Sequence, residues 1–349
     1  MNPTITQKER IISLDIIRGF ALFGILFINV GAFITMHEGV QIPDYYGLNE
    51  IISKLIEIFV EKKFFSIFSF LFGAGFYIFA SRAESRGDKP RWRFIRRLLA
   101  LLLIGIIHFI FFWGSILYAY AFIGFFLIPF YRAKVSTISK WLGGLITIYI
   151  LSLLLGIFAQ DMGVFTNVIA FLGNDTITIF IMFLSGFLAA KANWFRKISD
   201  LSTQIRWFQI IAFPLFIGFS IWIWFASQSN DQHIQEIIAL GTIPTTYLYL
   251  SIMFLILENR HVAKLLQPIA RVGQMAFTNY FAQSFIGLVI ISLMSLEIVS
   301  PINTVIISII IFAIQIIYSV IWFKFFKMGP LEKVWRLMTY GRNTATIRK

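Results

Sequence analysis

Residues 303–324 read NTVIISIIIFAIQIIYSVIWFK, and no charged side chain interrupts this stretch before Lys324. About 20 consecutive, mostly apolar residues are enough for an α-helix to cross the hydrocarbon core of a bilayer. Because other stretches have the same character, the sequence predicts an all-α, polytopic membrane protein with about ten transmembrane helices. The predicted helices cover residues 15–35, 64–81, 96–113, 115–131, 140–160, 172–190, 207–226, 237–257, 269–294 and 303–324.

The overall composition also indicates a membrane protein. Of the 349 residues, 58% are hydrophobic and only 13% are charged, whereas soluble domains keep about a quarter of their residues charged. No soluble domain separates the predicted helices, so we expect residues 1–349 to form a single integral membrane domain. The chain has no cysteine, which excludes disulfides and thiolate metal sites. No histidine has a second ligand at short spacing, so we expect no metal site.

The distribution of positive charge predicts how the helices cross the membrane. The formal net charge is +13, and 27 of the 30 lysines and arginines fall in alternate connections of the ten-helix arrangement, as the positive-inside rule requires. This pattern predicts an inner-membrane protein with both termini in the cytoplasm and basic loops against anionic membrane lipid. It accounts for the positive charge without nucleic acid, for which the sequence has no binding module.

Two segments outside the predicted transmembrane helices are amphipathic. In residues 48–62, apolar side chains recur at helical spacing while charged side chains occupy the other faces, and residues 331–338 show a similar pattern after a Gly-Pro pair. We expect both segments to form interfacial helices that lie on the bilayer.

Polar side chains inside a transmembrane helix are costly and usually face a cavity or a partner. In the first predicted helix, Asp15 and Arg18 are three residues apart and can pair on one face. Two interpretations remain open: an ion pair that anchors the helix, or an arginine that meets a phosphate-bearing ligand at the cytoplasmic edge. Asn29 lies three turns further along the same face, where it could line the other end of one cavity.

His108 is the only histidine inside a predicted transmembrane helix. A neutral imidazole can act as a general base at physiological pH, but a lone histidine can equally join helices by hydrogen bonds. His37, at the outer end of the first helix, is a second candidate base. Tyr118 follows His108 closely and is a candidate to contact the substrate.

For two further groups of polar residues, a structural and a functional interpretation both remain open. The arginines between residues 82 and 97, among them Arg93, Arg96 and Arg97, mainly set the orientation, but one or two could bind the phosphates of a nucleotide-like ligand. In the ninth predicted helix, Asn279 and Gln283 are four residues apart and share a face. Such amides either join neighbouring helices or line a cavity.

Four parts of the chain, in order and spread over nearly its whole length, resemble the YeiB-like family of bacterial integral membrane proteins. They are RIISLDIIRGFALFGILFIN at 10–29, KFFSIFSFLFGAGFYIFASR at 63–82, RRLLALLLIGIIHFIFFWGSILYAYAFIG at 96–124, and RVGQMAFTNYFAQS at 271–284 with GPLEKVWRLMTYG at 329–341. The family usually carries an aspartate after the Trp/Tyr-Gly pair of the third stretch, where this chain has Ser115.

The first stretch is also similar to the start of the heparan-alpha-glucosaminide N-acetyltransferase, and more faintly to the membrane acyltransferases that O-acetylate surface sugars. The resemblance implies a bacterial membrane acyltransferase that moves an acyl group from cytoplasmic acetyl-CoA or another acyl-CoA to an envelope or extracytoplasmic acceptor. The sugar O-acylating enzymes place a histidine eleven residues after the arginine of the first helix. Here Asn29 stands at that distance from Arg18, so His108 or His37 would have to supply the base.

The resulting hypothesis places the acyl-CoA phosphates near Arg18, which pairs with Asp15, and near the arginines Arg93, Arg96 and Arg97. A polar cavity lined by Asn29, His108, Tyr118, Asn279 and Gln283 would hold the acyl group and its acceptor. The alternatives are a transporter or exporter of a small molecule that uses the same polar residues, or a non-catalytic scaffold or sensor in the envelope.

Overall fold

The computed structural model describes residues 7–35, 43–112, 114–159 and 163–341, and the regular secondary structure in these residues is helical. The first part of the chain forms α1 (Gln7–Thr35), α2 (Leu48–Phe59), α3 (Lys63–Glu84), α4 (Pro90–Phe111), α5 (Leu117–Gly124), the 3-10 helices η1 (Phe125–Leu127) and η2 (Pro129–Arg132), α6 (Val135–Phe158) and α7 (Phe165–Leu172). The second part forms α8 (Asp175–Lys191), η3 (Trp194–Arg196), α9 (Ser202–Gln228), α10 (Ile234–Ile256), α11 (Arg260–Leu265), α12 (Gln267–Gln274), α13 (Ala276–Leu293), α14 (Pro301–Phe325) and α15 (Pro330–Tyr340).

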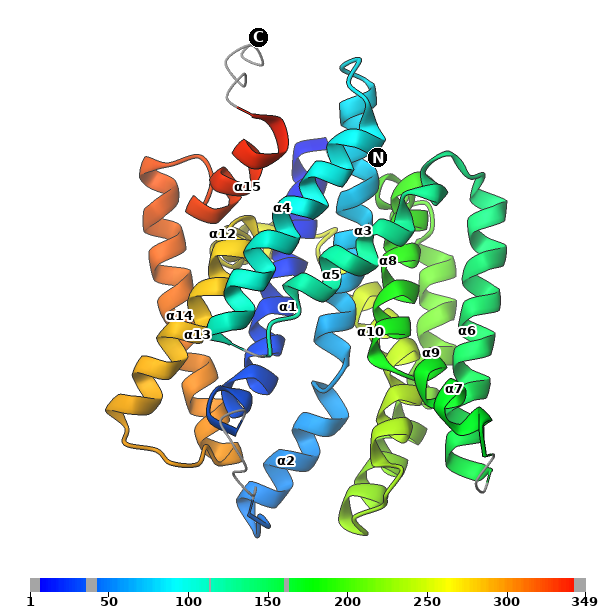
Figure 1. Ribbon diagram of the computed structural model, residues 1–349, viewed down its shortest axis with the longest axis vertical. Helices are drawn as coiled ribbons and strands as arrows, with labels where there is room; N and C mark the ends of the chain where they lie inside the picture. Colours follow the sequence, from blue (N-terminus) through cyan, green and yellow to red (C-terminus); the bar gives the residue numbers. More distant parts are fainter. Residues whose placement is uncertain (1–6, 36–42, 113, 160–162, 342–349) are drawn as a thin grey trace.

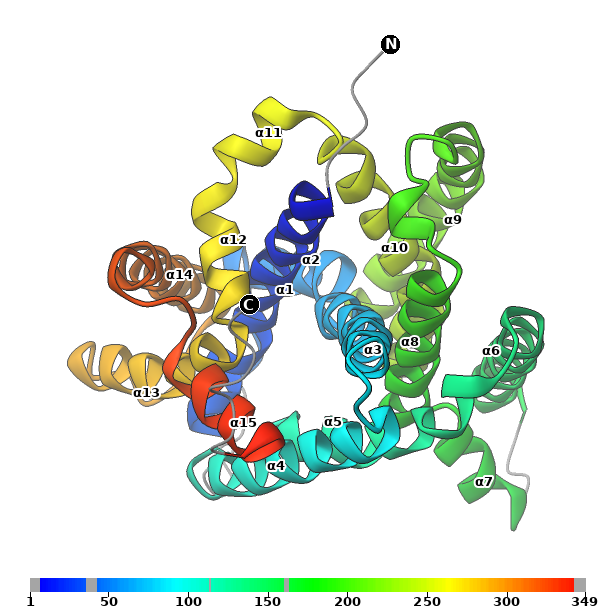
Figure 2. The ribbon, with the colours of Figure 1, turned by 90° about the horizontal axis from the view of Figure 1, so that it is seen from above.

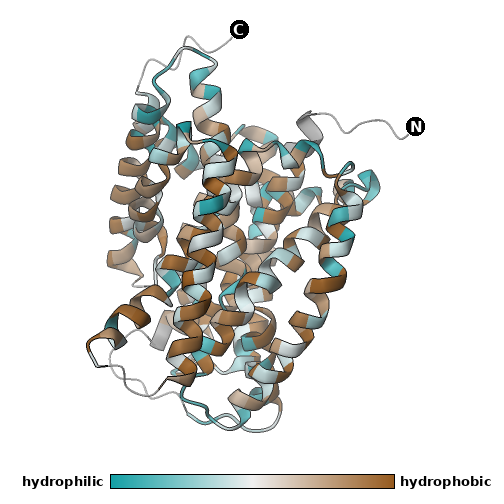
Figure 3. Cartoon of the chain, turned by 90° about the vertical axis from the view of Figure 1, so that its right-hand side faces the viewer, coloured by the Kyte–Doolittle hydropathy of each residue, from teal (hydrophilic) through white to brown (hydrophobic). Residues whose placement is uncertain are grey.

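Within the described residues, eight helices are long and apolar enough to cross a membrane, or nine if the bent pair of α7 and α8 is one span. Figure 3 shows hydrophobic residues concentrated in the middle of the molecule and hydrophilic residues toward both ends. The prediction of an all-α, multi-pass membrane protein is confirmed, and the predicted number of about ten spans is close to the observed number.

The helices form two connected groups. In one group α1 contacts α12, α13 and α14, and in the other α3 packs along α8 while α10 contacts α9 and α6. The two groups meet where α1 lies beside α3 (Figure 2). The start of α1 and α15, the first and last described helices, lie at the same end of the bundle (Figure 1). We call this end the terminal face and the other end the opposite face.

The fourth predicted span, residues 115–131, is not one continuous helix. Helix α5 has only 8 residues and is followed by η1 and η2, where Pro129 has no amide hydrogen to continue an α-helix. Figure 1 shows α4 and α5 meeting partway down the molecule, from where α5 returns to the terminal face. The pair therefore forms a hairpin that enters and leaves on one side. Whether the hairpin is counted as two spans or as none, the direction in which each later helix crosses the membrane stays the same.

The ninth predicted span, residues 269–294, is also interrupted. It divides at Met275 into α12 and α13. The carboxamide of Asn279 donates to the carbonyl oxygen of Val272 at 2.9 Å, and so satisfies a backbone group beside the break. Backbone groups inside a bilayer need such internal partners.

Both predicted amphipathic segments are helices, α2 and α15. In α2 the apolar side chains of Leu48, Ile51, Leu55 and Phe59 are exposed, whereas Lys54 is buried. An exposed apolar row fits a helix in contact with lipid. Helix α15 differs from the expectation, because it packs against α4 and α13.

Close packing of α3 on α8 depends on two glycines. A Cβ atom on Gly73 would overlap the carbonyl oxygen of Phe183, and one on Gly186 would overlap the carbonyl oxygen of Phe70. Small residues allow transmembrane helices to approach at backbone distance. This contact fixes the position of α3, which forms one wall of the cavity described below.

We expect Gly186→Ala to lower the free energy of unfolding by about 1–3 kcal/mol, because the added methyl group forces two backbones apart. The measurement is the midpoint of thermal unfolding of the purified protein in detergent. Gly218→Ala is the matched control, since no atom lies within 4 Å of a Cβ at that position, and it should leave the midpoint unchanged or raise it. An equal midpoint for Gly186→Ala and the wild type would contradict the packing argument.

Candidate functional site

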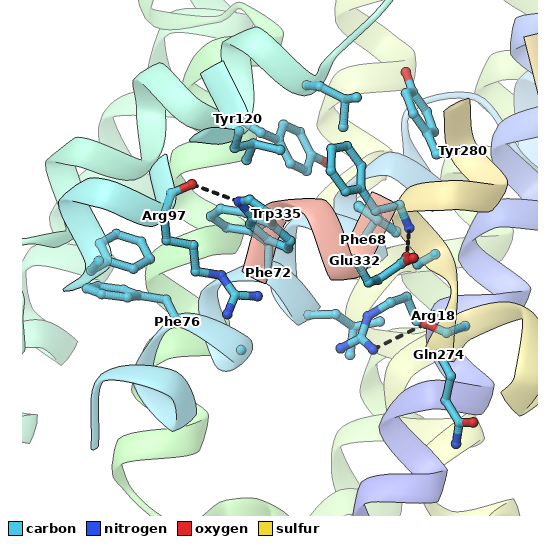
Figure 4. A pocket seen from close by; sticks show the side chains of 18 residues that line it. Arg18, Phe68, Phe72, Phe76, Arg97, Tyr120, Gln274, Tyr280, Glu332 and Trp335 are labelled. Carbon is cyan, nitrogen blue, oxygen red and sulfur yellow. Dashed lines mark hydrogen bonds between the residues drawn. The ribbon is translucent and has the colours of Figure 1, made fainter. Parts of the chain in front are cut away.

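A cavity of about 260 Å³ lies among α1, α3, α4, α5, α12, α13 and α15. Much of its wall is aromatic, with Phe68, Phe72 and Phe76 contributed by α3. The polar and charged side chains in the wall are Arg18, Arg97, Tyr120, Gln274, Tyr280 and Glu332, and Figure 4 shows the two arginines reaching into the same space from different helices. The cavity therefore combines apolar surface with positive charge.

Arg97 is held between aromatic rings. Its guanidinium carbon lies 3.9 Å from the centre of the Trp335 ring and 4.5 Å from that of Phe79, and the Trp335 indole donates to the Arg97 carbonyl oxygen at 2.8 Å. In the described part of the chain, no carboxylate lies within ion-pair distance of this guanidinium. Aromatic faces attract the cation without neutralising it, so its charge remains available to a ligand.

Arg18 reaches the same cavity from α1. Its Nη1 lies 2.7 Å from Asp15 Oδ1 and donates more weakly to the carbonyl oxygen of Gly273 at 3.4 Å. Asp15 is buried and does not line the cavity. The predicted pairing of Asp15 with Arg18 is therefore present. The Arg18 guanidinium lines the cavity, whereas the Asp15 carboxylate does not.

A second pocket, of about 410 Å³, adjoins the first. The two share Gly75, Arg97, Glu332 and Trp335 in their walls. The second pocket also contains side chains of α15 and of the end of α3, both at the terminal face in Figure 1. Among the described residues that line the two pockets there are five arginines and a single carboxylate, Glu332; the arginines are Arg18, Arg82, Arg86, Arg97 and Arg336. Such a balance favours an anionic ligand entering from the terminal face.

Glu332, the single carboxylate in these walls, holds the start of α13. Its Oε1 accepts from the backbone N–H groups of Phe277 and Thr278 at 2.8 and 3.1 Å, and its Oε2 accepts from the Thr278 hydroxyl at 2.5 Å. A carboxylate at a helix N-terminus satisfies free N–H groups and interacts favourably with the helix dipole. In return, the Thr278 hydroxyl accepts from the N–H of Leu331 at 3.1 Å. These hydrogen bonds join the start of α15 to the start of α13 at the cavity wall.

Two tyrosines form the deep wall. The Tyr120 hydroxyl lies 2.6 Å from Ser69 Oγ and donates to the carbonyl oxygen of Phe65 at 2.9 Å, which ties α5 to α3. The Tyr280 hydroxyl accepts from the N–H of Ile116 at 3.2 Å, which ties α13 to the start of α5. Both rings close the cavity on the side away from the arginines.

His108 is fully buried and does not line either pocket. Its Nδ1 lies 2.8 Å from Ser115 Oγ and its Nε2 lies 3.2 Å from Ser284 Oγ, an arrangement that one neutral imidazole can satisfy with one donor and one acceptor. The ring also packs against Tyr280, with 5.6 Å between the ring centres. One side chain, Tyr280, therefore stands between His108 and the cavity, and the partner at position 115 is a neutral hydroxyl.

The remaining predicted site residues lie outside the cavity. Asn279 joins α13 to α14 through Ser319, Gln315 and Tyr318, as the helix-joining interpretation expects. Asn29 and Gln283 are buried in the bundle and do not line the cavity, and Tyr118 is exposed beside Phe109. Arg93 pairs with Asp88, Arg96 donates to the Met338 carbonyl oxygen, and His37 lies outside the described residues.

Several cavity residues were not predicted from the sequence. Glu332, Trp335 and Arg336 belong to α15, which was expected to lie on the bilayer, and Gln274 and Tyr280 lie in the ninth predicted span, where only Asn279 and Gln283 were predicted as site residues. One signal was present: Glu332 is the only acidic residue after Glu297 in a tail rich in lysine and arginine. A lone carboxylate in such a tail suggests a specific partner.

Comparison with known proteins identifies the family. Residues 189–342 match a family model described as "Protein of unknown function (DUF418)". The "Uncharacterized 39.9 kDa protein in amylase 3'region" of Bacillus acidopullulyticus is 32% identical over 368 residues, covering 100% of this chain and 99% of that one. The "Uncharacterized protein YeiB" of Escherichia coli (strain K12) is 26% identical, with 98% of this chain and 99% of that one covered. The chain belongs to the YeiB-like DUF418 family.

A further member of the YeiB-like family is similar over nearly its whole length. The "Uncharacterized protein YxaH" of Bacillus subtilis (strain 168) is 28% identical, with 97% of this chain and 96% of that one covered. No solved structure matches the chain significantly. The stretches that resemble the family in sequence meet at the cavity: they supply Arg18, Phe72, Phe76, Arg97, Tyr120, Gln274, Tyr280, Glu332 and Trp335.

We expect Glu332→Ala to destabilise the protein by about 2 kcal/mol, because hydrogen bonds to a charged group contribute about 1.5–3 kcal/mol and α13 loses its cap. Glu332→Gln should lie between this variant and the wild type, since the amide keeps one accepting oxygen. The measurement is the thermal unfolding midpoint in detergent. Lys333→Ala, at an exposed neighbouring position, should match the wild type; a midpoint for Glu332→Ala equal to that of Lys333→Ala would refute the capping role.

Proposed function

We propose that this YeiB-like protein is a membrane acyltransferase that takes its acyl group from acyl-CoA. The observation that carries the proposal is the pair of adjoining pockets, in which five arginines face one carboxylate beside an aromatic wall. A ligand that fits must carry several negative charges and also an apolar part. Acyl-CoA has both, because its phosphates end in a long arm with an acyl thioester.

We further propose that the terminal face is the cytoplasmic face of a bacterial inner membrane, with both termini inside. The support is the excess of lysine and arginine in the connections at this face, where Arg82, Arg86 and Arg336 also line the second pocket. Acyl-CoA does not cross a bilayer, so its site has to open to the cytoplasm. The acceptor would be a hydroxyl or amine of an envelope or extracytoplasmic molecule.

In the proposed complex the phosphates lie against the guanidinium groups, which bind phosphate through charge-assisted hydrogen bonds. The arm then follows the aromatic wall of α3 toward Tyr280 and Tyr120. The acyl carbonyl would arrive next to Tyr280, whose ring packs against the imidazole of His108.

The proposed reaction is a direct transfer. The acceptor oxygen or nitrogen gives its proton to His108 and bonds to the acyl carbon, while the carbon–sulfur bond breaks and the thiolate of CoA leaves and takes up a proton. Tyr280 has to move for the imidazole to meet the acceptor, because its ring stands between His108 and the cavity. General-base catalysis of this kind contributes about 10²–10⁴-fold to a rate.

We expect Arg97→Gln to weaken binding of labelled acetyl-CoA by about 10–100-fold, the equivalent of one charge-assisted hydrogen bond. The measurement is equilibrium binding to the purified protein in detergent. Arg93→Gln is the matched control, because Arg93 lies one turn away on α4, pairs with Asp88 and does not line the pockets. Equal affinities for the two variants, or no binding by the wild type, would refute the donor site.

We expect His108→Ala to bind acetyl-CoA as the wild type does but to lose about 10²–10⁴-fold in hydrolysis or transfer of the labelled acetyl group. The two measurements on one preparation separate the donor site from the base. If the wild type binds acetyl-CoA and neither hydrolyses nor transfers it, or if His108→Ala turns over at the wild-type rate, the catalytic role is wrong.

A specific observation favours the transporter alternative. The α4–α5 hairpin and the break between α12 and α13 both border the cavity, and interrupted helices at a polar site are typical of secondary transporters. In this case the same arginines would bind an anionic cargo. Flux of labelled anions into proteoliposomes, without acyl transfer, would favour the transporter over the enzyme.

A further inference from the structure

A row of polar side chains is buried between α1, α13 and α14, outside both arginine-lined pockets. On α14 the row consists of Thr304, Ser308, Gln315 and Ser319, and α13 contributes Asn279 and Gln283; each of the six is at most 5% exposed. At 100° per residue, the four α14 positions fall within one narrow stripe along the helix. The stripe faces the protein, since residues such as Ile310 and Ile317 on the other side of α14 are exposed.

Several polar atoms in this row have no hydrogen-bond partner among the described protein atoms. They are both Nε2 and Oε1 of Gln283, Oε1 of Gln315 and Oγ of Ser308. Asn29 of α1 is buried next to this row, with its side chain at the hydroxyl of Tyr280. A buried polar atom left without a partner costs about 1–3 kcal/mol, and the surrounding bilayer offers none.

The unpaired groups are close neighbours in the bundle. Nε2 of Gln315 donates to the carbonyl oxygen of Asn279 at 2.9 Å, and Gln283 lies one turn beyond Asn279 on the same side of α13. One turn further, a Cβ on Gly287 would overlap the Phe33 ring and would lie 3.4 Å from Ile311. The two glutamines therefore lie at one level of the α1–α13–α14 junction, and Ser308 lies beyond Ile311, nearer the opposite face.

We propose that α1, α13 and α14 enclose bound water molecules at these side chains. The water binds at two levels, at Gln283 and Gln315 and at Ser308, with Ile311 and Phe33 between them. Buried water in proteins makes about three hydrogen bonds to groups of this kind. The bound water extends a polar path from Tyr280, at the deep wall of the cavity, toward Thr304 near the opposite face. Polar rows inside membrane proteins commonly mark such paths for ions or protons.

X-ray radiolytic footprinting of the intact protein tests this inference, because bound water produces hydroxyl radicals that modify side chains next to it. We expect Phe33 and Phe312, both less than 9% exposed beside the row, to be modified several-fold faster than Phe183 and Phe187, which are fully buried between α3 and α8. Mass spectrometry of the digested protein gives the four rates.

Gln283→Leu and Gln315→Leu remove the groups that hold the water and should lower the rates at Phe33 and Phe312 several-fold, while leaving the rates at Phe183 and Phe187 unchanged. Wild-type rates at Phe33 and Phe312 no higher than those at Phe183 would overturn the inference without any variant. Unchanged rates in both variants would overturn it as well. Neither result depends on whether the arginine-lined cavity binds acyl-CoA.

Discussion

Helix α12 approaches α1 so closely that backbone touches backbone, and the candidate site depends on this contact. A Cβ on Gly273 would overlap the carbonyl oxygen of Asp15, and one on Gly19 would overlap that of Ile269. Without side chains between them, the two helices hold Arg18 against the Gly273 carbonyl oxygen at the cavity wall. Because α13 begins two residues after α12 ends, the same contact also sets where Tyr280 stands. Small residues at helix crossings commonly serve this purpose in membranes.

The partners of the charged side chains around the cavity are consistent with an anionic ligand. Glu332 could neutralise an arginine, but its two oxygens are occupied by the first turn of α13 and by Thr278. Asp15 pairs with Arg18 from behind, and Arg97 is held by aromatic rings, which stabilise a cation and leave its charge in place. Inside a membrane, where the effective dielectric constant is low, an uncompensated positive charge attracts anions more strongly than it would in water. The arrangement keeps Arg18 and Arg97 ordered and leaves the charge of Arg97 without a carboxylate partner among the described residues.

Hydropathy and charge predicted the membrane fold and the two amphipathic helices, because these follow from local composition. For Asn279 the sequence left two interpretations open, and its contacts with α14 fit the helix-joining one. The break of the fourth predicted span into the short helix α5 and two 3-10 helices was not predicted, since residues 115–131 are as apolar as a span and hydropathy reports the preferred solvent, not the path of the chain. Nor could the sequence distinguish Arg97 from its six basic neighbours in residues 82–97. What sets it apart is Trp335, which is 238 residues away in the chain and is brought to it only by the folding of α15.

Tyr280 stands where three regions of the protein meet. Its ring closes the cavity and packs against His108, its hydroxyl accepts from Ile116 at the start of α5, and Asn29 of the buried polar row lies beside it. In this position it separates an arginine-lined space from an imidazole and from the polar row. A thioester in the cavity would thus be shielded from water on its inner side, and shielding of this kind suppresses hydrolysis of a reactive group before its acceptor arrives. Tyr280 is thus a side chain that contacts both the cavity and His108, so access from the cavity to this imidazole would depend on the position of its ring.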